Sequence, residues 1–229
     1  MLRILCIHGY RQNASIFREK TGSLRKMLKK IAEMVYITAP LQVSEDDFRN
    51  ESGTVVDGRG WWFSGPNSYF KALDASDFCF GLEESIKIVE KAFKEEGPFD
   101  GILAFSQGAA FLAILCAMQQ RKELQFNFNF AILIAGFKSR CSLHDIYYHE
   151  TISLPTLHVY GETDAVIGKD MSVDLLLNFK NPAIICHGGG HYVPATGAQK
   201  QSYLEFLQAR VDEKELHRKP SPNDEEDKS

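Results

Sequence analysis

The sequence predicts an α/β fold, with a mostly parallel sheet and helices on both faces. Short apolar segments of strand length alternate along the chain with longer segments of helical pattern. Several strand segments are apolar throughout, as expected when both faces of a sheet are covered. Ligands of such sheets bind beyond the carboxyl ends of the strands, so the residues that follow strands are the first candidates for function.

Six strands are expected, at residues 2–8, 34–39, 99–105, 128–135, 155–160 and 182–187. The apolar runs that define them end at turn-forming or small residues. Helices are expected at residues 14–30, 78–96, 106–121, 166–178 and 197–215. Two segments fall outside the alternation. Residues 41–77 lack sustained periodicity, and residues 137–153 form either a short cap or an ordinary loop.

Composition limits the function classes. A chain of 229 residues with 44% hydrophobic residues can bury one sizeable core, and we interpret residues 1–216 as a single domain. The formal net charge of −4 provides no basic field for nucleic acid. No apolar run reaches the length of a membrane span, and the N-terminus lacks a signal-peptide pattern. Residues 217–229 contain no anchoring apolar residue, so we expect a disordered acidic tail.

The cysteines indicate a reducing compartment. They are widely spaced, odd in number and without a Cys-x-x-Cys pair: Cys6, Cys79, Cys116, Cys141 and Cys186. This pattern is typical of the reduced thiols of a cytosolic protein. We therefore expect a cytoplasmic location, while the sequence leaves the oligomeric state open.

The most informative segment is residues 101–110, where an apolar strand meets a small-residue helix start with Ser106 at the junction. A sharp strand-to-helix turn pushes a serine hydroxyl out above the sheet, and it requires small flanking residues. Ala104 and Gly108 satisfy this requirement, although glycine is usual at both places. Ser106 is therefore a candidate nucleophile. The alternative is that Ser106 only caps the helix that follows.

An acid and a base follow Ser106 in the order that this architecture uses. Asp164 lies in the turn after the strand at 155–160, and His191 lies in the loop after the last strand. Asp170 and Asp174 are weaker alternatives to Asp164 because both fall inside the next predicted helix. His187 and His8 compete with His191. We expect His187 to close the last strand and His8 to belong to the loop after the first strand.

A metal site is disfavoured. His187 and His191 have the spacing of two ligands on a helix, but three consecutive glycines between them make a helix improbable. The lysines at 26, 29 and 30 are most simply a solvated helix face. The chemistry that the remaining candidates support requires no cofactor.

The loop after the first strand is expected to supply part of an oxyanion hole. Such a hole holds the oxyanion of a tetrahedral intermediate with backbone N–H groups. We assign one N–H to Gln107, directly after the candidate nucleophile, and the other to Tyr10. Gly9 allows the backbone to approach the substrate carbonyl closely.

The irregular segment 41–77 contains Trp61 and Trp62 and can be interpreted in two ways. The segment either forms a lid or acyl-binding wall over Ser106, with both tryptophans binding substrate, or the tryptophans simply pack it onto the core.

Five sequence segments together resemble the FSH-type family of serine hydrolases, within the α/β-hydrolase superfamily. They are HGYRQN at 8–13, RGWW at 59–62, FSQGA at 105–109, HVYGETD at 158–164 and GGHYVP at 189–194. The resemblance extends over about residues 2–210. It implies an α/β-hydrolase fold, hydrolysis of small carboxyl esters, and a Ser106, Asp164 and His191 triad.

Other functions on this fold stay open. Related family members act on acyl thioesters, and the Phe-Ser-Gln-Gly motif also occurs among acyl-protein thioesterases and carboxylesterases. A peptidase also stays open, because it would share the nucleophile and the oxyanion hole. A non-catalytic ligand-binding protein on the same fold is a weaker alternative, because such proteins usually lose a member of the triad and all three residues are present here.

Overall fold

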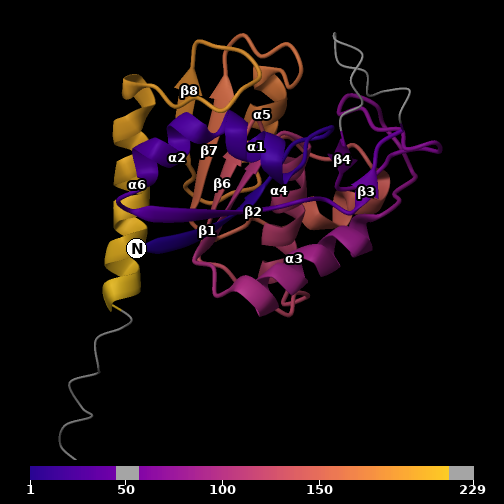
Figure 1. Ribbon diagram of the computed structural model, residues 1–229. Coiled ribbons are helices and arrows are strands. Elements are labelled where there is room, and N and C mark those ends of the chain that lie inside the picture. Colours follow the sequence, from indigo (N-terminus) through magenta and orange to yellow (C-terminus); the bar gives the residue numbers. More distant parts are fainter. Residues whose placement is uncertain (45–56, 217–229) are drawn as a thin grey trace, which may run out of the picture.

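The parallel sheet forms as the sequence predicts. The computed structural model of the chain describes residues 1–44 and 57–216. Within these residues, six parallel strands form one sheet in the order β2-β1-β5-β6-β7-β8 (Figure 1). They are β1 (Leu2–Ile7), β2 (Ala32–Ile37), β5 (Gly101–Phe105), β6 (Phe130–Ile134), β7 (Thr156–Gly161) and β8 (Ala183–His187). The predicted tail, residues 217–229, lies outside the described residues.

The central strands are covered on both faces. Every residue of β5 and β6 is buried, which explains why these strands are apolar throughout rather than alternating. Helix α4 (Gln107–Gln120) is almost as apolar, and its residues from Gln107 to Met118 are all buried.

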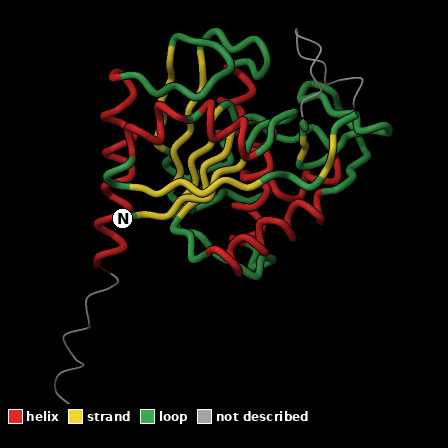
Figure 2. The backbone as a smooth tube through the Cα atoms, viewed as in Figure 1, coloured by secondary structure: helices red, strands yellow, loops and turns green. Residues whose placement is uncertain are grey.

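The chain leaves the centre of the sheet in two directions. From β1 it passes through α1 (Ala14–Lys20) and α2 (Gly22–Leu28) to β2, whereas from β5 it passes through α4 to β6 on the other side. Crossovers between parallel strands are right-handed, so these two sets of helices cover opposite faces of the sheet (Figure 2). The strand order therefore changes direction between β1 and β5. Open α/β sheets bind their ligands at such a point.

The remaining helices complete the two layers. Helix α3 (Leu82–Glu96) precedes β5, and α5 (Lys169–Leu176) connects β7 to β8. Helix α6 (Gly197–Leu216) follows β8, and its first half lines a groove together with α2. None of the helices in residues 1–44 and 57–216 is both long and apolar enough to cross a bilayer.

Two predicted helices differ from those in the structure. The helix expected at 14–30 is two helices, because Thr21 leaves helical geometry and its hydroxyl donates to the Phe17 carbonyl. The helix expected from 78 begins at Leu82, after Gly81 with a φ of 89° that a helix cannot contain. In the segment 137–153, where either a short cap or an ordinary loop is expected, a 3-10 helix spans Ser142–Tyr148.

The tryptophan pair packs the irregular segment onto the core. Trp61 and Trp62 are 0% and 1% exposed, so neither indole offers a face to a substrate. This burial favours the packing interpretation of the two tryptophans over the substrate-binding one. The short strands β3 (Leu41–Gln42) and β4 (Arg59–Gly60) pair in the same region. Residues 45–56 of the expected lid lie outside the described residues.

The three histidines His8, His144 and His158 are buried. Burial lowers the pKa of His8 and His144 to about 4 and that of His158 to about 3. Among the described residues, His158 Nε2 has no hydrogen-bond partner, and its ring packs against Phe179. These imidazoles are neutral in the folded chain at neutral pH.

We expect the free energy of unfolding to fall as the pH is lowered from about 6.5 to about 4. The unfolded chain takes up protons near the ordinary histidine pKa of 6.5, whereas the folded chain resists until about pH 4. Within that window, each such histidine therefore lowers the free energy of unfolding by roughly 1 kcal/mol for each unit by which the pH falls. Above about pH 6.5 it causes no loss of stability. Urea unfolding between pH 7.5 and 4.5 measures the slope.

Two variants separate this effect from the titration of carboxyl groups. His158→Leu should flatten the slope because it removes a buried titrating group, whereas His149→Gln, at an exposed position, should leave it unchanged. Equal slopes in the His158→Leu variant and the wild type would contradict the assignment.

Candidate active site

Three loops at the carboxyl ends of the strands bring the predicted triad together. Ser106 directly follows β5, Asp164 follows β7, and His191 follows β8. Ser106 Oγ lies 3.0 Å from His191 Nε2, and His191 Nδ1 lies 2.8 Å from Asp164 Oδ2. The carboxylate can only accept, so Nδ1 carries the imidazole proton and Nε2 is free to accept from the hydroxyl. This is the hydrogen-bond order of a nucleophile, a base and an orienting acid.

Ser106 occupies a strained turn. Its φ is 56° and its ψ is −119°, which is unfavourable for a residue with a side chain. The turn is held by a 2.9 Å bond from the Ser106 N–H to the Ile134 carbonyl in β6. The Ser106 side chain makes no capping bond to α4, because its hydroxyl is directed to His191. Simple helix capping therefore does not describe this serine.

Gly108, two residues after Ser106, is required by a close backbone approach. A Cβ added to Gly108 would lie 2.3 Å from the His8 carbonyl oxygen, a distance that real Cβ atoms do not show. Gly108 thus allows the start of α4 to pass directly over the end of β1. Ala104, which departs from the usual glycine, is completely buried and pairs with Ile7 and Leu133 in the sheet.

Asp164 is held in place from its own loop. Its Oδ1 accepts the backbone N–H groups of Val166 and Ile167, each at 2.8 Å, which leaves Oδ2 for His191. The side chain is only 1% exposed. The alternatives have other positions: Asp174 pairs with Lys138 at 3.1 Å, and Asp170 lies in the first turn of α5.

The glycine-rich loop places His191 and gives His187 a separate role. His187 is the last residue of β8, and its Nδ1 accepts the Gly189 N–H at 3.3 Å. The Tyr192 ring packs edge-on against His187 at 5.0 Å, and the Phe105 ring lies 4.8 Å from that of His191. In the described residues, no cluster of three side chains has the arrangement of a metal site.

The loop after β1 borders the candidate nucleophile. A Cβ added to Gly9 would lie 2.9 Å from the Phe105 ring and 3.3 Å from Ser106 Cβ. The glycine is thus needed for packing against the turn at Ser106, beyond any approach to substrate. The Tyr10 side chain points into segment 61–70, where its hydroxyl donates to the Ser68 carbonyl. Gln107 begins α4, so its N–H lacks an acceptor within the helix.

The side chain of Gln107 is a feature that the sequence analysis missed. Only its backbone N–H was assigned a role, yet its carboxamide is completely buried and bonds to Trp61 and Trp62. The signal in the sequence was a polar residue at the start of an otherwise apolar helix.

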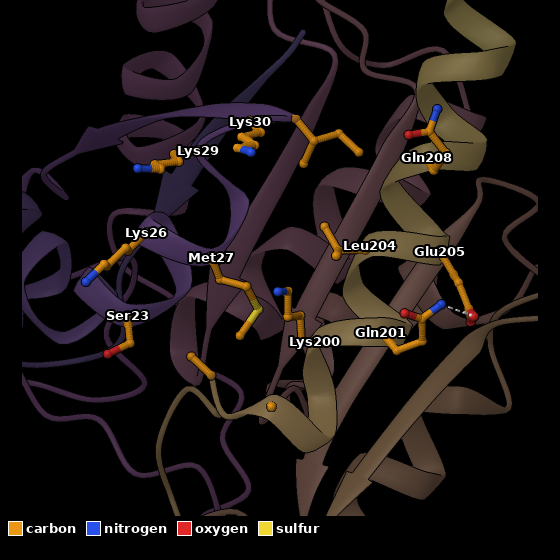
Figure 3. A pocket seen from close by; sticks show the side chains of 13 residues that line it. Ser23, Lys26, Met27, Lys29, Lys30, Lys200, Gln201, Leu204, Glu205 and Gln208 are labelled. Carbon is orange, nitrogen blue, oxygen red and sulfur yellow. Dashed lines mark hydrogen bonds between the residues drawn. The ribbon is translucent and has the colours of Figure 1, made fainter.

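A groove of about 900 Å³ lies away from the triad, between α2 and α6. Figure 3 shows Met27 of α2 and Lys200 and Leu204 of α6 pointing into it, while Lys26 and Lys29 extend away from α6. Lys26 in α2 is exposed, as are Lys29 and Lys30, which follow the end of that helix; the three are solvated, but only Lys26 lies on a helix.

Comparison with known proteins identifies the family. Residues 1–203 match the family described as serine hydrolase (FSH1). The chain is 51% identical over 218 residues to a protein named esterase OVCA2 from Danio rerio, covering 90% of this chain and 96% of that protein. It is 50% identical over 212 residues to the Xenopus tropicalis protein of that name, covering 90% and 92%.

Solved structures agree on the fold. The structure of acyl-protein thioesterase 2 from Zea mays superposes with a TM-score of 0.63 at 17% identity, covering 92% of this chain and 94% of the maize protein. At that identity the likeness concerns the α/β-hydrolase fold alone. All five cysteines are unpaired thiols, as the sequence predicts. From the family match and its esterase relatives, we conclude that the chain belongs to the FSH1 family of serine hydrolases and is an enzyme.

Proposed function

We propose that the chain hydrolyses small carboxylic esters through an acyl-enzyme formed on Ser106. The observation that carries this proposal is the unbroken hydrogen-bond chain from Ser106 Oγ to His191 and on to Asp164, with distances of 3.0 and 2.8 Å. In this proposal Ser106 is the nucleophile, His191 is the general base and acid, and Asp164 orients the imidazole.

The first half-reaction transfers the acyl group to the enzyme. Ser106 Oγ attacks the ester carbonyl carbon while its proton moves to His191 Nε2. The carbonyl oxygen becomes an oxyanion, which the N–H groups of Tyr10 and Gln107 stabilise. The tetrahedral intermediate then collapses: the bond to the alcohol oxygen breaks, and that oxygen takes the proton from Nε2. The alcohol leaves, and the acyl group stays on Ser106.

The second half-reaction repeats these steps with water. A water molecule gives a proton to His191 Nε2 as it attacks the acyl-enzyme, and Ser106 recovers that proton when the carboxylic acid departs. Neither half-reaction uses a cofactor. The unpaired thiols support placing this reaction in the cytoplasm.

Acyl thioesters are the second candidate substrate class. The same nucleophile and oxyanion hole serve both esters and thioesters, so only the pocket discriminates between them. The names of the curated relatives favour esters. A series of matched oxyesters and thioesters of graded acyl length, compared by kcat/KM, decides between the two classes.

A fluorophosphonate probe tests the proposal directly. It should label the folded protein once, on Ser106, and an ester substrate present in excess should slow the labelling. Peptide mapping of the labelled protein identifies the residue. Labelling at another serine, or none under conditions where the protein is folded, would contradict the proposed nucleophile.

A further inference from the structure

The buried carboxamide of Gln107 makes two bonds to the backbone of the tryptophan segment. Its Oε1 accepts the Trp61 N–H at 2.9 Å, and its Nε2 donates to the Trp62 carbonyl at 2.8 Å. One partner is a donor and the other an acceptor, so only one orientation of the carboxamide satisfies both. The backbone of this same residue supplies one of the two proposed oxyanion-hole N–H groups.

Trp61 extends the connection to the loop after β1. Its indole Nε1 donates to the His8 carbonyl at 2.7 Å, and its own carbonyl accepts the Ser85 hydroxyl of α3 at 2.6 Å. The indole also stacks on Phe111 of α4, with ring centroids 5.2 Å apart. Trp61 is thereby fixed against two helices while it holds the backbone at His8.

His8 in turn orients the next peptide unit. Its Nε2 accepts the Ala39 N–H at 3.0 Å, so its proton lies on Nδ1, which donates to the Gly9 carbonyl at 2.7 Å. Burial lowers the pKa of His8 to about 4, which preserves this neutral form. In a trans peptide the carbonyl and the following N–H point in opposite directions. The bond to the Gly9 carbonyl therefore sets the direction of the Tyr10 N–H.

We infer that Gln107 is a positioning residue of the oxyanion hole. Through Trp61 and His8, its carboxamide connects the turn that carries the Gln107 N–H to the loop that carries the Tyr10 N–H. The inference rests on the proposed ester hydrolysis. Two donors from distant parts of the chain must meet a single oxyanion, and an oxyanion hole works only when each donor lies about 2.7–3.1 Å from it. A chain of buried hydrogen bonds keeps that spacing rigid.

The test begins with Gln107→Met, which keeps the length of the side chain and removes both bonds. We expect kcat to fall about 10-fold to 100-fold, less than the loss of a whole donor, because both N–H groups remain but are poorly placed. KM should change by less than about threefold, since the donors act mainly in the transition state. The affinity for a trifluoromethyl ketone, whose adduct with Ser106 carries the oxyanion, should fall with kcat.

Gln107→Glu provides a rescue that depends on protonation. A protonated glutamic acid accepts from the Trp61 N–H and donates to the Trp62 carbonyl, as glutamine does, whereas the carboxylate repels that carbonyl. The kcat of this variant relative to wild type should therefore rise as the pH falls. Gln107→Met should show no such change in the ratio. Circular dichroism at each pH restricts the comparison to folded protein.

Gln119→Met is the matched control on the same helix. Gln119 accepts the Phe128 N–H at 2.8 Å and donates to the Phe128 carbonyl at 2.9 Å, so it makes the same pair of bonds near the far end of α4. Its loss should lower the melting temperature and leave kcat within about twofold, because only folding depends on it.

The outcomes separate this inference from the proposed function. Folded Gln107→Met with kcat within twofold of wild type overturns the positioning role alone. If Gln107→Met does not fold, a folded Gln107→Glu variant whose kcat equals that of wild type at a pH where the introduced carboxyl group is ionised overturns it. A wild-type chain without ester turnover overturns the proposed function and this inference together.

Discussion

Ser106→Ala is expected to lower kcat for ester hydrolysis by about 10⁴-fold or more, because the members of a triad act as a unit and the oxyanion hole alone supplies little. The substitution removes one oxygen atom from a side chain in a residue that is only 9% exposed, so the fold should persist. Turnover of a chromogenic acyl ester measures the effect, and fluorophosphonate labelling should disappear in parallel.

Ser139→Ala is a fitting control for this experiment. Ser139 is also buried and also bonds a histidine, with its Oγ 2.7 Å from His144 Nδ1. It lies outside the proposed triad, so its loss should leave kcat within about twofold even if stability falls. Retention of more than a tenth of the rate in Ser106→Ala would refute Ser106 as the nucleophile.

Asp164→Asn should reduce kcat by about 10³-fold to 10⁴-fold with the fold intact. The reason lies in the two N–H groups of Val166 and Ile167, which bond Oδ1 and would keep the asparagine oxygen on their side. The asparagine NH₂ would then face His191 Nδ1 and donate to it. The imidazole proton would move to Nε2, where it faces Ser106 and cannot accept the hydroxyl proton.

A crystal structure and kinetics of Asp164→Asn test this tautomer argument together. The geometry around residue 164 should be unchanged while turnover is lost. Asp174→Asn is the control, since that carboxylate pairs with Lys138 at the surface and should leave kcat within about twofold. Near-normal turnover in Asp164→Asn would show that another group orients His191.

The predictable parts of the fold rest on local pattern. Apolar runs such as those of β5 and β6 report burial on both faces of a sheet, and all six predicted strands are confirmed. The break in the helix at Thr21 was not predicted, because the apolar spacing continues through it and the deciding bond is to the Phe17 carbonyl. Helix pattern reports which face is buried and says little about where a helix is interrupted.

The same division applies to the candidate site. By itself, the sequence predicted the proposed triad and its order: Ser106, Asp164 and His191 each follow a strand, and parallel strands bring their carboxyl ends to one edge. The tertiary structure alone decided the hydrogen bonds of the Gln107 carboxamide and the burial of Trp61 and Trp62. Periodicity along a chain describes contacts within elements, whereas these contacts join segments distant in sequence, so only the packed fold defines them.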